Sequence, residues 1–92
     1  SDEVALRVYG MLRSRGLRGP EDISVAGYDD HRAIAETLYP PLTSAELPYV
    51  QMGTQAAALL LELIERGQAA GSNPRKVQGA LAWRDSVTQQ AQ

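Results

Sequence analysis

Cysteine is absent from this chain of 92 residues, and histidine and lysine each occur once. The absence of cysteine excludes a disulfide framework, a thiolate metal site and a thiol nucleophile. The lone histidine, His31, has no second histidine or cysteine at ligand spacing, so we expect no metal site and place it at the solvated start of a helix. Because there is no thiol, the sequence does not indicate whether the protein works in an oxidising or a reducing compartment.

Long apolar runs and a large excess of one charge are missing as well. No apolar run approaches the ~20 residues of a membrane-spanning helix, and no N-terminal stretch has the basic-then-apolar design of a secretory signal. The formal net charge is -2, with 11 acidic residues against 9 lysines and arginines, so we expect no duplex-binding surface here. The composition predicts a small globular domain with a thin core and no membrane contact.

The first sixteen residues carry a clear helical pattern. The run Ser1-Asp2-Glu3 has no initiator methionine and leads directly into this pattern, so we expect a piece of a longer protein. Asp2 is a suitable N-cap and Gly16 a suitable stop, which predicts a helix over Glu3–Arg15.

The next segment carries strand signals. A loop with Gly19 and Pro20 precedes an apolar, β-rich stretch that predicts a buried parallel strand over Ile23–Gly27, with a short helix through Ala35 after it. Two consecutive prolines then forbid helix and favour extended backbone. We expect Leu42–Leu47 to form a second strand beside the first.

The C-terminal half opens with the strongest helix pattern in the chain. Pro48 suits its first turn and Gly67 ends it. Its broad apolar face consists of Met52, Ala56, Leu59, Leu60, Leu63 and Ile64. We expect Gln68–Pro74 to be a mobile crossover, and the alternation over Val77–Trp83 predicts a strand in which Trp83 packs in the core rather than stacking on a ligand. The order α-β-α-β-α-β predicts an α/β fold with a parallel, helix-covered sheet.

Two successive acids, Asp29 and Asp30, follow the first predicted strand. Open α/β sheets bind ligands outside the carboxyl ends of their strands, so these acids are the first candidates for a binding site. The residues alone leave a second interpretation open, because aspartate is a leading N-cap residue and a short helix comes next.

Several segments of the chain resemble the C-terminal third of bacterial lactose-repressor (LacI/GalR) family transcription regulators. The resemblance extends from Ser1 to about Val87. It rests on Ser1-Asp2-Glu3-x-Ala5-Leu6, Arg15-Gly16-Leu17-Arg18-x-Pro20-Glu21-Asp22-Ile23-Ser24-Val25-x-Gly27-Tyr28-Asp29-Asp30, Pro40-Pro41-Leu42-Thr43, Gly53 and Arg84-x-Ser86. These motifs stand in the family's order and at nearly its spacing.

The resemblance implies a two-lobed effector-binding core of the type I periplasmic-binding-protein-like kind. Residues 1–46 and 75–88 would belong to the C-terminal lobe, and residues 47–67 would form a helix that crosses to the N-terminal lobe. The DNA-binding headpiece of the family is absent from this sequence. The apolar face of the crossing helix would lack its partner here, so we expect association, either as a homodimer or as a swapped oligomer.

The same resemblance implies site residues. Asp29 matches the family position whose carboxylate accepts hydrogen bonds from effector hydroxyls in the cleft, and charge-assisted acceptance of this kind suits polyol recognition. Ser1 falls where the family most often has an asparagine that faces the effector. We expect Asp30 and Asp2 to cap and orient rather than bind.

Dimer contacts are also implied, at Leu6 and around Leu38 and Tyr39. Neither the resemblance nor the residues imply a catalytic residue, a metal ligand or a cofactor. In particular, no Ser-His-acid set, phosphate-cradling glycine loop or metal cluster is visible.

Taken together, these features predict the effector-sensing, dimerising part of a cytoplasmic transcription repressor that binds a small molecule, with a sugar as the expected effector. The alternative is part of a periplasmic sugar-binding component of a transporter, which shares the two-lobed fold. A third class, the response-regulator receiver domain, also has paired acids after a strand. It needs a further strand ending in Asp and a Lys on a later strand, whereas the one lysine, Lys76, lies beside a loop.

Overall fold

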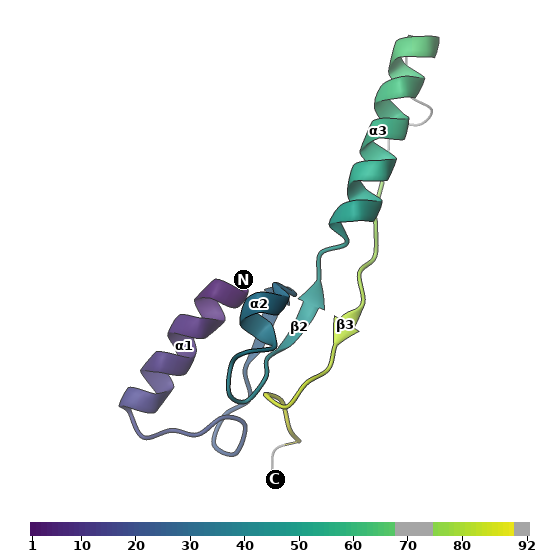
Figure 1. Ribbon diagram of the computed structural model, residues 1–92. Coiled ribbons are helices and arrows are strands. Elements are labelled where there is room, and N and C mark those ends of the chain that lie inside the picture. Colours follow the sequence, from purple (N-terminus) through teal and green to yellow (C-terminus); the bar gives the residue numbers. More distant parts are fainter. Residues whose placement is uncertain (68–74, 90–92) are drawn as a thin grey trace. The chain divides into compact units, whose positions relative to one another are not determined.

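The computed structural model describes residues 1–67 and 75–89. Helices and strands alternate along the chain as predicted (Figure 1), and the crossover predicted at Gln68–Pro74 lies outside the described residues. The elements are α1 (Asp2–Ser14), β1 (Ala26–Asp29), α2 (Arg32–Ala35), β2 (Thr43–Glu46), α3 (Tyr49–Arg66) and β3 (Leu81–Ala82). They form two compact units, one from the described residues of Ser1–Leu47 and Ala80–Gln92 and one from those of Pro48–Gly79.

Helix α1 lies within one residue of its predicted limits at each end but has a different N-cap. The hydroxyl of Ser1, not the carboxylate of Asp2, accepts a hydrogen bond from the amide of Val4, at 3.3 Å. The prediction for Asp2 was wrong because its side chain is fully buried and bonded elsewhere. At the other end, Gly16 takes a left-handed φ of 71° and the chain turns off the helix as predicted.

The core of the first unit is thin, as expected for so short a chain. Its buried apolar residues are Ala5, Ala35 and Leu42, with Tyr9, Val25 and Leu38 packed against them. Asp2, Ala5 and Tyr9 follow helical spacing, so they define the inward face of α1. Val4 and Met11, which belong to the apolar pattern of the same helix, are exposed.

The sheet has the strand order β1-β2-β3. Strands β1 and β2 are parallel neighbours, in a register that runs from Ala26 opposite Thr43 to Asp29 opposite Glu46, and this confirms the predicted pairing. The predicted limits of the first strand were wrong by about three residues. The amide of Val25 bonds to the carbonyl of Ser86, at 3.0 Å, instead of joining the ladder, so β1 begins one residue later and continues to Asp29.

Strand β3 corrects the expectation of an all-parallel sheet. It is two residues long and antiparallel to β2, with Ala45 opposite Leu81 and Ser44 opposite Ala82. The chain leaves and re-enters the sheet at the same end of β2, so the returning strand must run the opposite way. Trp83, which follows β3, is 70% exposed, so its predicted place in the core was also wrong.

Helix α2 is a single short turn, and neither Asp29 nor Asp30 caps it. Its N-cap residue is His31, which makes no side-chain capping bond. His31 is exposed at the start of the helix, as predicted. The carboxylate of Asp30 is instead engaged by Arg84.

Helix α3 begins after Pro48 and ends at Gly67, whose φ is 76°, in agreement with the predicted limits. None of its residues is buried in the described structure. The exposed large apolar side chains of this helix are Tyr49, Val50, Met52, Leu60, Leu61, Leu63 and Ile64. Glu62 pairs with Arg66, at 3.6 Å, and with Arg75, at 3.8 Å. Within the described residues, no helix is long and apolar enough to cross a membrane.

Gly27, in the middle of β1, is the tightest position in the sheet. A Cβ there would collide with the carboxylate of Asp2 and would lie 2.8 Å from Leu42 Cδ2. The close approach of α1 and β2 to this strand therefore depends on the missing side chain.

We predict that Gly27→Ala destabilises the chain by about 1–3 kcal/mol, because the extra methyl group overpacks a closed site. Gly10→Ala is the matched control, since a Cβ at Gly10 meets nothing within 4 Å and Gly10 lies inside α1. That substitution should stabilise by up to about 1 kcal/mol, through helix propensity. Urea unfolding followed by circular dichroism measures both, and equal stability of Gly27→Ala and the unmodified chain would contradict the packing described.

Candidate functional site

Two successive aspartates, the last residue of β1 and the residue after it, lie in the left-handed region. Asp29 has a φ of 118° and Asp30 a φ of 54°. For residues with a side chain, such conformations cost about 1–3 kcal/mol each and persist where the surroundings hold them. The carbonyl of Asp29 accepts from the amide of Leu47, at 3.3 Å, and the amide of Asp30 donates to Ser44 Oγ, at 3.0 Å. The turn after β1 is thus tied to Ser44 within β2 and to Leu47, the residue that follows β2.

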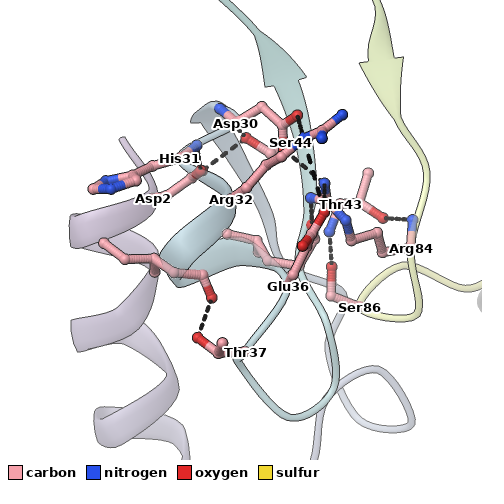
Figure 2. Close-up of polar contacts among 12 residues, drawn as sticks. Asp2, Asp30, His31, Arg32, Glu36, Thr37, Thr43, Ser44, Arg84 and Ser86 are labelled. Carbon is pink, nitrogen blue, oxygen red and sulfur yellow. Dashed lines mark hydrogen bonds and ion pairs between the residues drawn. The ribbon is translucent and has the colours of Figure 1, made fainter.

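A buried carboxylate ties the same turn to α1. Asp2 is fully buried, and its Oδ2 accepts from the amide of His31, at 2.6 Å, while its Oδ1 accepts from Ser44 Oγ, at 2.7 Å. Figure 2 shows Asp2 between His31 and Ser44. The negative charge also lies in the first turn of α1, where the helix dipole favours it. One side chain therefore joins the start of α1, the turn after β1 and the middle of β2.

Arg84 binds the turn from the C-terminal segment. Its Nη2 donates to Asp30 Oδ1, at 2.8 Å, and its Nη1 donates to the carbonyl of Leu42, at 2.6 Å. Its backbone amide donates to Thr43 Oγ1, at 2.8 Å. The two charged side chains are nearly buried, with 14% of Arg84 and 8% of Asp30 exposed, so solvent screens this ion pair far less than a surface pair.

Two exposed charges lie around this pair. Arg32 Nε is 4.0 Å from Asp30 Oδ2 and 3.8 Å from Glu36 Oε1, and Glu36 Oε1 is 3.9 Å from Arg84 Nη2. The Arg32 side chain is 76% exposed, so its contribution is small. Arg84 is therefore the principal cationic partner of Asp30.

Ser86 completes the polar interior of the first unit. Its Oγ accepts from the amide of Thr43, at 2.8 Å, and donates to the carbonyl of Val25, at 2.6 Å. The hydroxyl thus joins the start of β2 to the segment before β1. Among the described residues, no buried side-chain nitrogen or oxygen lacks a hydrogen-bond partner.

The two residues predicted to bind the effector lie at the same edge of the sheet. Asp29 is the last residue of β1 and is half-buried, and Ser1 is exposed at the N-terminus of α1. The hydrogen bond from His31 to Asp2 brings these two chain segments together, as Figure 2 shows. Asp2 and Asp30 hold the surrounding backbone through a hydrogen bond and an ion pair, but neither caps a helix, so the capping part of their predicted role was wrong.

The residues predicted at a dimer interface are differently exposed. Leu6 is exposed and Tyr39 is 87% exposed, whereas Leu38 packs against the core. Tyr39 also lines a hollow of about 400 Å³ near Val25, at the other end of β1 from Asp29. In the same hollow, burial raises the pKa of Tyr9. Tyr9 donates to the carbonyl of Pro40, at 2.8 Å.

The hydrogen-bonding residues of the interior were not assigned a role from the sequence. They are Thr43, Ser44, Arg84 and Ser86, of which three lie within the motifs quoted above. One signal was available, because polar residues in strands predicted to be buried need partners. Among residues 1–67 and 75–89, no group of three or more His, Asp or Glu side chains could hold a metal ion.

Comparison with known proteins gives consistent matches. A family model for the periplasmic binding protein-like domain matches residues 1–87. The HTH-type transcriptional regulator CelR of Thermobifida fusca is 44% identical over 64 residues, which are 70% of this chain and 18% of that protein. The chain therefore spans less than a fifth of that relative's length.

Solved structures agree with this match. A LacI family transcriptional regulator from Enterococcus faecium with bound ribose has a TM-score of 0.77 at 30% identity, over 95% of this chain and 32% of that chain. The lac repressor dimer bound to operator and an anti-inducer has a TM-score of 0.74 at 32% identity, over 85% of this chain and 26% of that one.

The fold and the aspartate-bearing turn at the carboxyl edge of β1 thus define a periplasmic-binding-protein-like domain. The chain belongs to this family, in the form found in LacI family transcription regulators, which confirms the resemblance noted in the sequence.

We predict that Asp2→Ala lowers the free energy of unfolding by about 3 kcal/mol, because it leaves the His31 amide and the Ser44 hydroxyl without their charged acceptor. Asp2→Asn should lower the free energy of unfolding by less, since its amide oxygen can still accept one of the two hydrogen bonds. Glu3→Ala is the control, because Glu3 lies in the same helical turn but is exposed, and its loss should stay within about 0.5 kcal/mol. Urea unfolding that shows equal losses for Asp2→Ala and Glu3→Ala would rule out the buried network.

Proposed function

We propose that the chain is the effector-sensing part of a bacterial transcription repressor, and that the effector is a sugar whose hydroxyls donate to the carboxylate of Asp29. The observation that carries this proposal is the place of Asp29, at the carboxyl end of a parallel strand, where open α/β sheets bind ligands. The bound ribose of the similar regulator from Enterococcus faecium supports a sugar as the ligand class.

The geometry suits recognition of polyols. A carboxylate accepts short, directional hydrogen bonds from hydroxyl groups. Ser1 lies at the same edge, and its hydroxyl accepts from Val4, so its O–H remains to donate to a sugar oxygen. We assign to Ser1 this secondary role in the site.

We further propose that sugar binding controls DNA binding through a homodimer. The exposure of Leu6 and Tyr39 supports a contact between copies, and the similar lac repressor is a dimer bound to operator. DNA would be held by a headpiece outside this sequence, and the protein would act in the cytoplasm. A sugar that binds one of two dimer arrangements more tightly shifts the population toward it, which changes the separation of the headpieces.

A further proposal concerns the placement of the lobes. We propose that residues 1–46 and 75–88 lie in the C-terminal lobe and that residues 47–67 cross to the N-terminal lobe. The exposed apolar side chains of α3 support this, because burying a leucine or isoleucine contributes roughly 1.5 to 3 kcal/mol. Another part of the protein or a swapped copy would cover that face.

We predict that Asp29→Asn, made in the complete gene product that contains this chain, weakens sugar binding by about 10- to 100-fold, the equivalent of one charge-assisted hydrogen bond. Asparagine keeps the size of the side chain and tolerates a positive φ. Calorimetric titration with ribose, glucose, galactose, maltose, lactose and cellobiose identifies the sugar and measures its Kd. Operator affinity without sugar should be unchanged, since we assign Asp29 to sugar binding and DNA binding to the headpiece.

Glu46→Gln is the matched control, because Glu46 stands opposite Asp29 in the register of β1 and β2. It should bind sugar as the unmodified protein does. If Asp29→Asn leaves both sugar affinity and operator release intact, the site is wrong. A gene product with a secretory signal peptide and no DNA-binding segment would instead support the transporter component.

A further inference from the structure

We propose that Arg84 is a positioning residue for the sugar site: by holding Asp30, it fixes the turn that presents the carboxylate of Asp29. This inference rests on the proposed function of Asp29 and adds to it a residue that lies far along the chain. Arg84 donates to the carboxylate of Asp30, the residue that directly follows Asp29.

The first argument is the geometry of the guanidinium. One arm of its planar fork donates to Asp30 and the other to the carbonyl of Leu42, at 2.8 Å and 2.6 Å. Leu42 immediately precedes β2, so Arg84 holds the turn after β1 at a fixed place relative to the neighbouring strand. The fork is rigid, which a flexible lysine ammonium is not.

The second argument is the strain of the turn. Asp29 and Asp30 both have positive φ values, which residues with side chains adopt only where contacts hold them. Besides the contact with Arg84, the bonds described above hold the backbone of the turn, through Leu47, Ser44 and Asp2, and the Asp30 carboxylate also lies 4.0 Å from the exposed Arg32. Relaxation toward negative φ would rotate the Asp29 carboxylate away from its position.

The third argument is the environment of the ion pair. Arg84 and Asp30 are nearly buried, whereas the other cation near Asp30, Arg32, is mostly exposed at 4.0 Å. A buried carboxylate that loses its cationic partner is destabilised, so the loss of Arg84 favours a rearrangement of the turn. Two arginines thus lie near the Asp30 carboxylate, and we expect only the nearly buried one, Arg84, to affect sugar binding.

The test is calorimetric titration of the complete gene product with the sugar found in the panel above, at a temperature where circular dichroism shows each variant folded. Arg84→Gln should weaken binding about 10-fold, the loss expected from one misplaced charged acceptor. Arg32→Gln should stay within about 2-fold, because exposed pairs contribute little. Ser86→Ala disturbs the same segment without touching Asp30, so it should lower stability and leave the affinity within the same limit.

Arg84→Lys keeps the positive charge but not the planar guanidinium. It should lower the sugar affinity about 3-fold, which distinguishes the effect of orientation from that of charge alone. It also serves if Arg84→Gln does not fold. In an Asp29→Asn background, either substitution at Arg84 should cost less than about 2-fold more, because a positioning effect disappears with the group that is positioned.

The outcomes separate the inference from the proposed function. If Asp29→Asn does not weaken binding, or if no sugar of the panel binds, the proposed site fails and this inference fails with it. If Asp29→Asn weakens binding but both Arg84 variants bind normally, the inference alone is overturned. Additive losses in the double variant, or an equal loss in Ser86→Ala, would likewise reduce Arg84 to a structural role.

Discussion

The arrangement of the first unit depends on one buried charge, the carboxylate of Asp2. A buried carboxylate is stable only where hydrogen bonds satisfy it, and Asp2 has two donors, one from the turn after β1 and one from β2. Its position in the first turn of α1 adds the favourable helix dipole. Gly27 provides the room that this carboxylate occupies. The helix, the turn and the sheet are therefore held in register by a single side chain.

The same interior explains why polar contacts, and not apolar volume, specify this unit. Among the described residues of the first unit, four buried side chains are polar and three are apolar. The polar ones are Asp2, Thr43, Ser44 and Ser86, and the apolar ones are Ala5, Ala35 and Leu42. Two of the apolar residues are alanines, so the core offers little area to bury. Directional hydrogen bonds then determine where each segment lies, including the turn that carries Asp29.

Local patterns predicted the helices well and the sheet only in part. The limits of α1 and α3 followed from apolar spacing and from Gly16 and Gly67, because these signals act within a few residues. The limits of β1 and the environment of Trp83 were predicted wrongly, since both depend on contacts with segments that are distant in the sequence.

The candidate site shows the same division. Asp29 could be found from the sequence, because a β-rich run that ends in acids marks the edge of a sheet. The contact of Arg84 with Asp30 spans 54 positions, and the contact of Asp2 with Ser44 spans 42. The periodicity of a short segment gives no indication of such long-range pairs. The role of Asp2 was therefore mistaken for a helix cap, and the roles of Ser44 and Arg84 appeared only with the fold.

The most direct test of the central role of Asp2 is site-resolved hydrogen exchange of the His31 amide, measured by NMR. This amide precedes α2 and has no strand or helix partner, so only its 2.6 Å bond to Asp2 can protect it. The account predicts slow exchange at His31, comparable with that of the amides in β2. Exchange at the rate of an unstructured peptide, with β2 still protected, would contradict it.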